Sequence, residues 1–493
     1  MNLLVFDHAS RFEYDAWETL GNDGWNWDSI FESMQRASNF TQSPPPFDYT
    51  GEAVAKGGPV QYAINDNILE HQKTFLPAMK KLGVPNNLES LDGDPLGAMF
   101  QPSSVHRQGV HYTRSYSVSY LATAGRNLQV VTNATVAKIN IQAGRATGVT
   151  LQNGTVITAK KEVILSAGTM KSPGVLELSG IGNKTILQKA GITPVIDLPG
   201  VGENLQDHLR IQNNYELKPN TIGADILRFN TTYASEQRAL YNAGKRSLYD
   251  ATANGFAFLN WNQMFGAETD RKLVALAKKV VGASRSPIDA VKLDYLTKAQ
   301  SRSVPQAEII LSDGYLGVRG YPAPTNGSQG RVFVTLIAGV QHPFSKGSVH
   351  INTTNPTGAP LIDPKYLGNE YDLEATKLSA QYLRKLANTA PLNGSWTAEF
   401  EPGPSVVTDA DWASYVRNST WTIYHPAGTC AMLPKEDGGV VDSTLKVYGV
   451  SNLRVVDASI MPILISAHIQ TAVYGIAERA ADFIVDEWSY RKS

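Results

Sequence analysis

The sequence predicts an α/β protein, and three observations lead to this prediction. Helix and strand signals alternate along the whole chain of 493 residues. Two stretches, 162–174 and 453–484, each have the pattern of a buried strand that leads into a helix. A hydrophobic content of 42% is enough to form about two or three domains, each with its own core.

Three strand patterns stand before the first predicted helix start. Residues 127–141 alternate between apolar and polar side chains, as a half-buried strand does. Residues 148–158 predict a hairpin around Asn153-Gly154, a pair that suits the positive φ angles of a type I′ turn. Residues 162–168 form an apolar run, which predicts a parallel strand covered on both faces.

The helix after this strand has its own start signals. Ser172 can cap it, and Pro173 would occupy the first helical position, where a missing N–H costs nothing. A strand, a turn of small residues and a helix N-terminus form the unit with which α/β folds bring backbone N–H groups to a phosphate or a flavin. The unit is compatible with a cofactor site, but it also occurs where the turn binds nothing.

The C-terminal unit repeats this arrangement. Residues 453–457 predict a buried strand that stops at Asp457 and Ala458, and Ser466 predicts the cap of the next helix. His468 would then lie in the first turn, where the helix end carries a partial positive charge; a surface or capping histidine is the alternative. The apolar positions that share one face of this helix are Ile469, Val473, Ile476, Ala480 and Ile484.

Charge and composition narrow the class of partner. The chain has 44 basic and 45 acidic residues and no block of like charges, so we expect no nucleic acid partner. Its longest apolar stretches, such as 453–465, contain charges and are shorter than the roughly 18 to 20 residues of a membrane helix. Cys430 is the only cysteine, and we predict no metal site. A small-molecule substrate is therefore expected, and the oligomeric state is left open.

The chain contains nine Asn-X-Ser/Thr triplets, several of them in predicted turns or loops. Chance would supply a share of these triplets, so a protein without glycans is the alternative interpretation. The first eight residues do not have the pattern of a signal peptide. We therefore expect a secretory or extracellular glycoprotein whose signal lies outside this sequence. The nine positions are Asn39, Asn133, Asn153, Asn183, Asn230, Asn326, Asn352, Asn393 and Asn418.

Four separate parts of the chain resemble the glucose-methanol-choline (GMC) family of flavin-dependent oxidoreductases. The first has residues 168–182 (GTMKSPGVLELSGIG), similar to the family's second signature, followed by residues 198–208 (LPGVGENLQDH). The second, residues 343–349 with 360–367, resembles the start of the family's C-terminal region. The last two, residues 424–432 (YHPAGTCAM) and 455–462 (VVDASIMP), resemble its active-site segments. Their order and spacing are similar to the fungal glucose oxidase and aryl-alcohol oxidase branch.

The start of the chain resembles only the second half of the family's first signature. The residues that fit are Asn2, Phe6, Ala9 and Asp15, while His8 stands where many members have arginine. The glycine-rich turn of the first half would precede Met1, and the sequence contains no G-x-G-x-x-G elsewhere. We therefore expect the chain as given to be N-terminally truncated, to hold FAD weakly and to be poorly stable.

The resemblance implies two domains. A Rossmann-like FAD-binding domain would comprise residues 1–60, 115–215 and 426–493 and would lack its first βαβ unit. A substrate-binding domain with an antiparallel sheet and helices would comprise residues 61–114 and 216–425. The stretch 213–335 carries no family motif, and its residues 272–281 predict an amphipathic helix. The resemblance implies that this stretch forms the wall of the substrate site, which differs between members, so the sequence does not identify the substrate.

The resemblance also implies roles for single residues. Oxidation of an alcohol needs a base for the hydroxyl proton, and histidine has a suitable pKa. By resemblance His425 is this base, and His468 is the partner that orients the substrate oxygen or shares its proton. The residues expected to contact FAD are Asn2, Val136, Gly168, Ser172, Asp457 and Ala458.

Three functions remain open at this point. The first is FAD-dependent oxidation of an alcohol to a carbonyl, by an oxidase or a dehydrogenase, in a fungal pathway for an aromatic alcohol or another secondary metabolite. The second is a lyase or cyclase of the same family that keeps flavin as a scaffold. The third is a non-catalytic remnant without cofactor.

Overall fold

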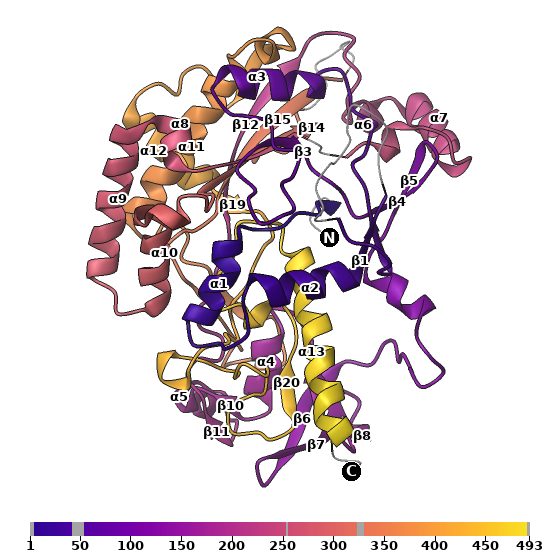
Figure 1. Cartoon of the computed structure of the whole chain (residues 1–493), viewed down its shortest axis with the longest axis vertical. Coiled ribbons are helices and arrows are strands. Elements are labelled where there is room, and N and C mark those ends of the chain that lie inside the picture. The colour runs from indigo at the N-terminus through magenta and orange to yellow at the C-terminus, as the bar shows by residue number, and fades with distance from the viewer. Residues whose placement is uncertain (1–3, 42–53, 253–254, 323–329, 491–493) are drawn as a thin grey trace.

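The computed structural model describes residues 4–41, 54–252, 255–322 and 330–490. These residues form an α/β fold with two halves (Figure 1). The upper half contains a six-stranded antiparallel sheet and most of the helices, and the lower half contains several small sheets and the long C-terminal helix. The α/β class and the expected antiparallel sheet are therefore confirmed, whereas the domain boundaries stay a prediction.

The helices and strands of the described residues have the following bounds. The helices are α1 (Arg11–Thr19), α2 (Trp27–Ala37), α3 (Phe75–Lys81), α4 (Ser172–Leu178), α5 (Lys184–Lys189), α6 (Ile226–Phe229), α7 (Thr231–Asn242), α8 (Trp261–Phe265), α9 (Ala267–Gly282), α10 (Pro287–Thr297), α11 (Glu370–Ala387), α12 (Asp409–Ser419) and α13 (Gln470–Tyr490). The strands are β1 (Ser38–Phe40), β2 (Val60–Tyr62), β3 (Gly97–Phe100), β4 (Val105–Gln108), β5 (His111–Arg114), β6 (Val136–Gln142), β7 (Arg145–Leu151), β8 (Val156–Thr158), β9 (Val163–Leu165), β10 (Ile181–Gly182), β11 (Ile196–Asp197), β12 (Leu209–Leu217), β13 (Gly255–Leu259), β14 (Ala307–Asp313), β15 (Phe333–Val340), β16 (Ser348–His350), β17 (Leu361–Asp363), β18 (Trp396–Glu401), β19 (Trp421–Thr422) and β20 (Leu453–Val455).

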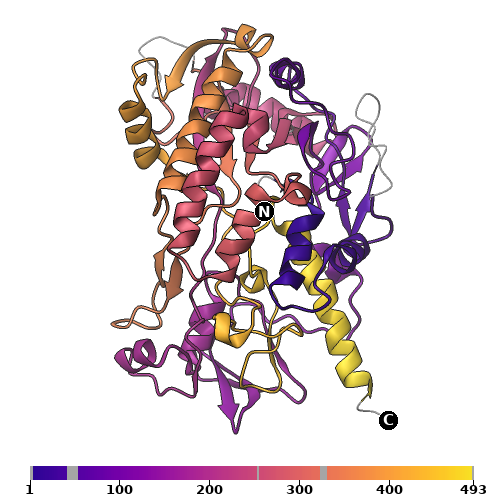
Figure 2. The ribbon, with the colours of Figure 1, turned by 60° about the vertical axis from the view of Figure 1, so that its left-hand side comes forward.

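The large sheet has the strand order β13-β14-β15-β12-β18, and β19 also pairs with β12. Successive side chains of a strand point to opposite sides of a sheet, and in this sheet apolar side chains occur on both sides. On β13, Ala257 and Leu259 pack into the core with α9, α11 and α12, which cover one face (Figure 2). Phe256 and Phe258 belong to a second buried cluster on the other face.

The same alternation places one charged residue among apolar neighbours. Strand β14 directs Ala307, Ile309 and Leu311 toward the helices, so that Glu308 and Ile310 point to the opposite face. Glu308 is buried there. A buried carboxylate needs a cation or hydrogen-bond donors, so this position must face a polar partner from the lower half.

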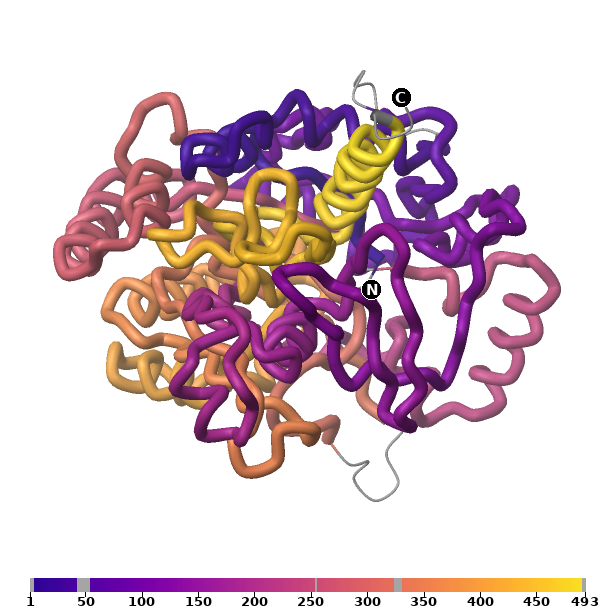
Figure 3. The backbone as a smooth tube through the Cα atoms, turned by 90° about the horizontal axis from the view of Figure 1, so that it is seen from below, coloured from indigo at the N-terminus to yellow at the C-terminus, as the bar shows by residue number. Residues whose placement is uncertain are grey.

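The lower half is built around the C-terminal helix. Helix α13 packs along α2, and Figure 3 shows this helix in yellow near the N-terminal segment in indigo. Gly475 permits the close approach, because a Cβ at this position would lie 2.9 Å from Cγ of Met34. Beside these helices, β9 and β20 pair in parallel, and β6, β7 and β8 form an antiparallel sheet. None of the described helices combines the length and apolarity needed to cross a membrane.

Two strand predictions need correction. Only the end of the expected strand 127–141 is a strand, because residues 127–135 pair with no strand among the described residues, and Val131 is 68% exposed. The hairpin at 148–158 is present, but its turn is not type I′, since Asn153 does not have a positive φ. Leu151 accepts from the N–H of Gly154 and Gly154 alone is left-handed, which is a three-residue loop with a bulge.

The first strand-helix unit also differs from its prediction. Strand β9 pairs with β20, but Ile164 is 46% exposed, so the strand is not covered on both faces. Ser172 is the first residue of α4 rather than its cap, and Pro173 is therefore the second. The Oγ of Ser172 donates to Asp457 and accepts from the N–H of Ala167, so it ties the turn to its neighbours.

The C-terminal helix starts later than predicted. Helix α13 begins at Gln470, so His468 lies two residues before it and not in its first turn. Ser466 does not cap this helix because its N–H and hydroxyl both donate to the buried carboxylate of Glu13. His342 Nε2 lies 2.7 Å from the same carboxylate, and the N–H of Ser10 donates to it at 2.9 Å. Glu13 thus joins α1, the segment before α13 and the upper half of the molecule.

We predict that Glu13→Ala lowers the free energy of unfolding by about 3 kcal/mol, because it leaves several buried donors without an acceptor. The urea midpoint of tryptophan fluorescence measures this, since Trp17 is buried in the same core. Glu13→Gln keeps one acceptor oxygen, so its free energy of unfolding should lie between those of the parent and Glu13→Ala. Glu32→Ala, at an exposed position of α2, is the control and should change stability by less than about 0.5 kcal/mol. Equal losses for Glu13→Ala and Glu32→Ala would contradict the prediction.

Candidate active site

The sequence motifs, far apart along the chain, converge in the structure. Gln206 and Ala427 exchange two backbone hydrogen bonds of 3.0 and 2.9 Å, which pairs residues 198–208 with residues 424–432. A Cβ on Gly428 would lie 2.5 Å from the Asn204 carbonyl, so only glycine permits this approach. Thr169 donates from its hydroxyl to the Pro426 carbonyl, which adds the turn before α4 to the same assembly.

The segment around His425 is held by one buried carboxylate. Asp207 accepts from the N–H of His425 at 3.1 Å and from the hydroxyls of Tyr366 and Thr422 at 2.6 and 2.5 Å. Tyr424 has a φ of +66°, a left-handed conformation that is unfavourable for a bulky residue. These hydrogen bonds stabilise the strained turn and fix the direction in which the His425 side chain leaves the backbone.

His425 itself is fully buried and uncharged. Burial lowers the pKa of His425 well below its usual value, and the neighbouring positive charge of His468 lowers it further. Its Nδ1 lies 2.9 Å from Nδ1 of His208. Its Nε2 has no hydrogen-bond partner among the described residues. His425 is therefore a neutral imidazole with one nitrogen free to meet a ligand.

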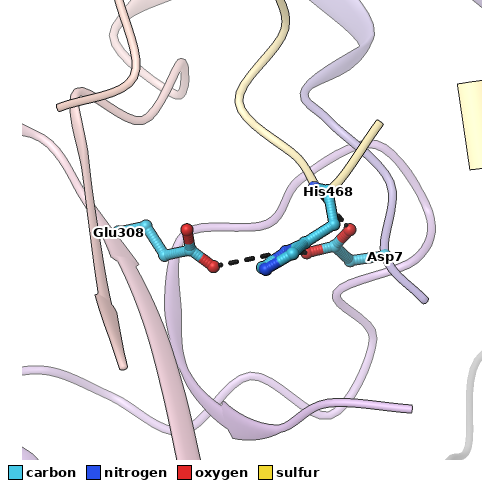
Figure 4. A group of neighbouring side chains, drawn as sticks. All are labelled: Asp7, Glu308 and His468. Atoms are coloured by element: carbon cyan, nitrogen blue, oxygen red, sulfur yellow. Dashed lines mark hydrogen bonds and ion pairs between the residues drawn. The ribbon is translucent and has the colours of Figure 1, made fainter. Parts of the chain in front are cut away.

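His468 lies between two carboxylates (Figure 4). Its Nδ1 is 3.1 Å from Oδ2 of Asp7 and 3.4 Å from Oε1 of Glu308, and its backbone N–H donates to Asp7 at 2.9 Å. Burial alone would lower the pKa of His468, but the charges of Glu308 and Asp7 raise it to about 9. Burial raises the pKa of Glu308 to about 7. His468 is therefore a cation at neutral pH.

The two predicted catalytic residues lie next to each other. The ring centroids of His425 and His468 are 4.7 Å apart, with the ring planes at 79°. A neutral imidazole can accept a proton, and an adjacent imidazolium can stabilise negative charge on an oxygen. The pair can therefore remove a proton from a hydroxyl group and stabilise the resulting alkoxide.

The predicted cofactor residues lie at two places. Gly168, Ser172 and Asp457 meet, because the Asp457 carboxylate accepts from the N–H of Gly168 at 2.9 Å and from Ser172 at 2.6 Å. Ala458 follows Asp457, and its carbonyl accepts from the N–H of Gly428. Val136 lies apart from this group, at the start of β6. Asn2 lies outside the described residues.

An apolar cavity of about 500 Å³ lies beside the turn before α4. Strand β9, including Ile164, forms one wall, and Val136 at the start of β6 forms part of another. Met170 and Lys171 of the turn also line it. The cavity thus connects Val136 with the turn that contains Gly168, and its apolar walls suit a flat, mostly apolar group.

Sequence reasoning missed three residues of this site. His208 belongs to a motif noted for its resemblance, yet nothing local distinguishes it from a packing residue. Asp7 lies next to His8, the only feature of that segment that departs from the family pattern. Glu308 lies in a stretch without motifs, and a single acid inside an apolar strand pattern was the signal that could have identified it.

The chain is similar to known proteins along most of its length. Sequence models of the GMC oxidoreductase family match residues 1–210 and residues 343–477. The GMC oxidoreductase family protein Mala s 12 of Malassezia sympodialis is 32% identical, over 98% of this chain and 78% of its own length.

Two solved structures share the fold. An FAD-dependent oxidoreductase from Chaetomium thermophilum has a TM-score of 0.85 and 26% identity, covering 99% of this chain and 85% of its own. A fungal aryl-alcohol oxidase has a TM-score of 0.84 and 28% identity, covering 99% of this chain and 84% of its own. The arrangement of the described elements therefore corresponds to that of known flavin-dependent enzymes.

The charge of His468 predicts a pH-dependent stability. A histidine whose pKa rises from about 6.5 when unfolded to about 9 when folded stabilises the fold fully below pH 6.5, and this contribution is lost as the pH rises through 9. Asp7→Asn keeps the hydrogen bond to the backbone of His468 but removes one charge. We expect the parent to lose about 2 kcal/mol more than this variant between pH 6.5 and 9.

Urea unfolding at a series of pH values measures this difference. His350→Gln is the matched control, because Glu177 and Glu203 raise the pKa of His350 to about 9 against its burial, at a place outside the site. The difference in the free energy of unfolding between the parent and Asp7→Asn should keep the same pH dependence when His350→Gln is introduced into both proteins. Parallel curves for the parent and Asp7→Asn would show that Asp7 does not stabilise a cationic His468 in the folded protein.

Proposed function

Since this chain belongs to the GMC oxidoreductase family, we propose that its active site oxidises an alcohol to a carbonyl with FAD as cofactor. The observation that supports this most strongly is the buried pair of His425 and His468, one neutral and one cationic, with their ring centroids 4.7 Å apart. This is the pair of roles that removal of a hydroxyl proton requires.

Several features of the described residues fit FAD. The apolar cavity lined by Val136 and Ile164 suits the adenine end of the cofactor, next to the turn at Gly168. A buried nitrogen without a partner, such as Nε2 of His425, fits a site that a ligand completes. Gly168, Ser172 and Ala458 would hold the cofactor from the ends of β9 and β20. When bound, FAD supplies the acceptor for the hydride of the alcohol.

The protein side of the reaction follows from the two histidines. His425 accepts the hydroxyl proton at Nε2, and because its pKa is lowered it is already unprotonated at neutral pH. His468, which Asp7 and Glu308 keep protonated, stabilises the negative charge that develops on the substrate oxygen. The burial of both rings excludes water and strengthens these interactions.

The surroundings of the histidines favour an aromatic or otherwise apolar alcohol. The cluster on the inner face of the large sheet contains Phe256, Phe258, Ile310 and Ile337. The ring centroid of Phe256 is 5.7 Å from that of His468. Apolar walls with few polar groups select apolar ligands, in line with the likeness to a fungal aryl-alcohol oxidase.

Two other functions remain to be tested against this proposal. A non-catalytic remnant without cofactor would show no flavin absorbance, at about 450 nm, after incubation with FAD and removal of the unbound FAD by gel filtration. A lyase or cyclase that uses flavin as scaffold would show this absorbance, but an alcohol would not bleach it under anaerobic conditions. Bleaching by an aromatic alcohol is the result expected for the oxidoreductase.

We predict that His425→Ala lowers the rate of flavin reduction in the FAD-loaded protein by the roughly 10²- to 10⁴-fold that is typical of a lost general base. Substrate affinity should change much less, since the apolar wall stays intact. Anaerobic stopped-flow measurement of the absorbance decay gives both quantities. His106→Ala, at an exposed histidine of β4, is the control and should behave like the parent. A reduction rate near that of the parent would remove His425 from the role of base.

We also propose that the protein enters the secretory pathway. Eight of its nine glycosylation triplets lie in the described residues and none of these asparagines is buried; Asn326 lies outside them. Asn133, Asn153, Asn230, Asn393 and Asn418 are exposed. We predict that glycosidase digestion of the native product increases its gel mobility, and that replacing these five asparagines by glutamine reduces this shift. Unchanged mobility after digestion would argue against secretion.

A further inference from the structure

His208 and His425 face each other because of a backbone register. Gln206 and Ala427 form an antiparallel bridge. His208 lies two residues after Gln206 and His425 two residues before Ala427, so their side chains lie on the same side of the paired segments. The Nδ1 atoms of the two rings are 2.9 Å apart, and the ring planes cross at 87°. Both side chains are fully buried, so neither ring exchanges this contact for water.

A contact between two Nδ1 atoms requires one donor and one acceptor. Burial and neighbouring positive charges lower the pKa of both histidines well below the usual value, so both rings are neutral and each carries one proton. Only two arrangements are then possible. Either His208 donates from Nδ1 and His425 carries its proton on Nε2, or His425 donates from Nδ1 and its Nε2 keeps the lone pair.

The proposed role of His425 distinguishes these arrangements. Nδ1 of His425 is occupied by the contact with His208, and its Nε2 has no hydrogen-bond partner among the described residues, so Nε2 is the nitrogen that remains to face a substrate. A base must present a lone pair there, so the proton of His425 belongs on Nδ1 and that of His208 on Nε2. Nδ1 of His208 is then the acceptor.

We propose that His208 is a positioning residue that fixes the tautomer of His425. His425 donates from Nδ1 to Nδ1 of His208, and its Nε2 is left as the unprotonated nitrogen in the site. A base must present a lone pair to the hydroxyl proton, so the wrong tautomer would direct an N–H at the substrate instead. This inference rests on the proposed role of His425 as base, but the tautomer itself can be observed without catalysis.

The direct test is ¹⁵N NMR of the full chain with selectively labelled histidine. The His425 signals are assigned by their loss in His425→Gln. We expect a protonated Nδ1 and an unprotonated Nε2 for His425. A protonated Nε2 in the parent protein would overturn the proposal. If the tautomer is as expected but His425→Ala reduces flavin at the parental rate, the proposed function fails and the assignment of the tautomer stands.

Two variants separate positioning from packing. His208→Asn offers an amide oxygen near the place of Nδ1, so we expect it to keep the parental tautomer and a flavin reduction rate within a few-fold of the parent. His208→Leu fills the space without an acceptor, so we expect a mixed tautomer signal and a rate about tenfold lower, with unchanged substrate affinity. If His208→Leu keeps the parental tautomer, or if both variants lose activity equally, His208 does not act through His425.

Discussion

The structure depends on the buried carboxylate of Glu13, which joins segments that lie far apart in the sequence. It accepts from the backbone and side chain of Ser466 and lies 2.7 Å from Nε2 of His342, so it holds the segment before α13 against α1 and the upper half. A buried charge is stable only when its partners stay in place. His468 follows Ser466 by two residues, so the same interaction sets its position beside Asp7.

This packing gives two neighbouring histidines opposite charge states. Asp7 comes from the first described segment and Glu308 from the large sheet, and together they favour a proton on His468. His425 lies beside His208 and His468, and no carboxylate of the described residues forms an ion pair with its ring, so burial keeps it neutral. One residue type thus supplies both an acceptor of protons and a fixed cation, because the distances to carboxylates differ. Phe256 and Phe258 exclude water, which strengthens the electrostatic interactions that give His425 and His468 different charge states.

Parts of the site could be predicted from sequence, and the errors have common causes. His425 and His468 were identified from their motifs, and the structure brings them together. The helix start predicted at Ser466 was wrong because its side chain found a tertiary partner, Glu13, instead of the helix end. Residues 127–135 show strand periodicity but form no strand, since a strand needs a neighbour to satisfy its backbone groups. Local patterns therefore failed where a distant partner decided the outcome.

The sequence by itself determined the α/β class, the alternating faces of the strands, the apolar face of α13 and the family motifs, because these depend on the order and spacing of residues along the chain. Only the tertiary structure decided which charges meet. The position of Glu308 beside His468, and of His208 opposite His425, follows from packing across 160 and 217 positions of sequence. No local pattern encodes such pairs, since they arise when separate elements bury their surfaces against one another.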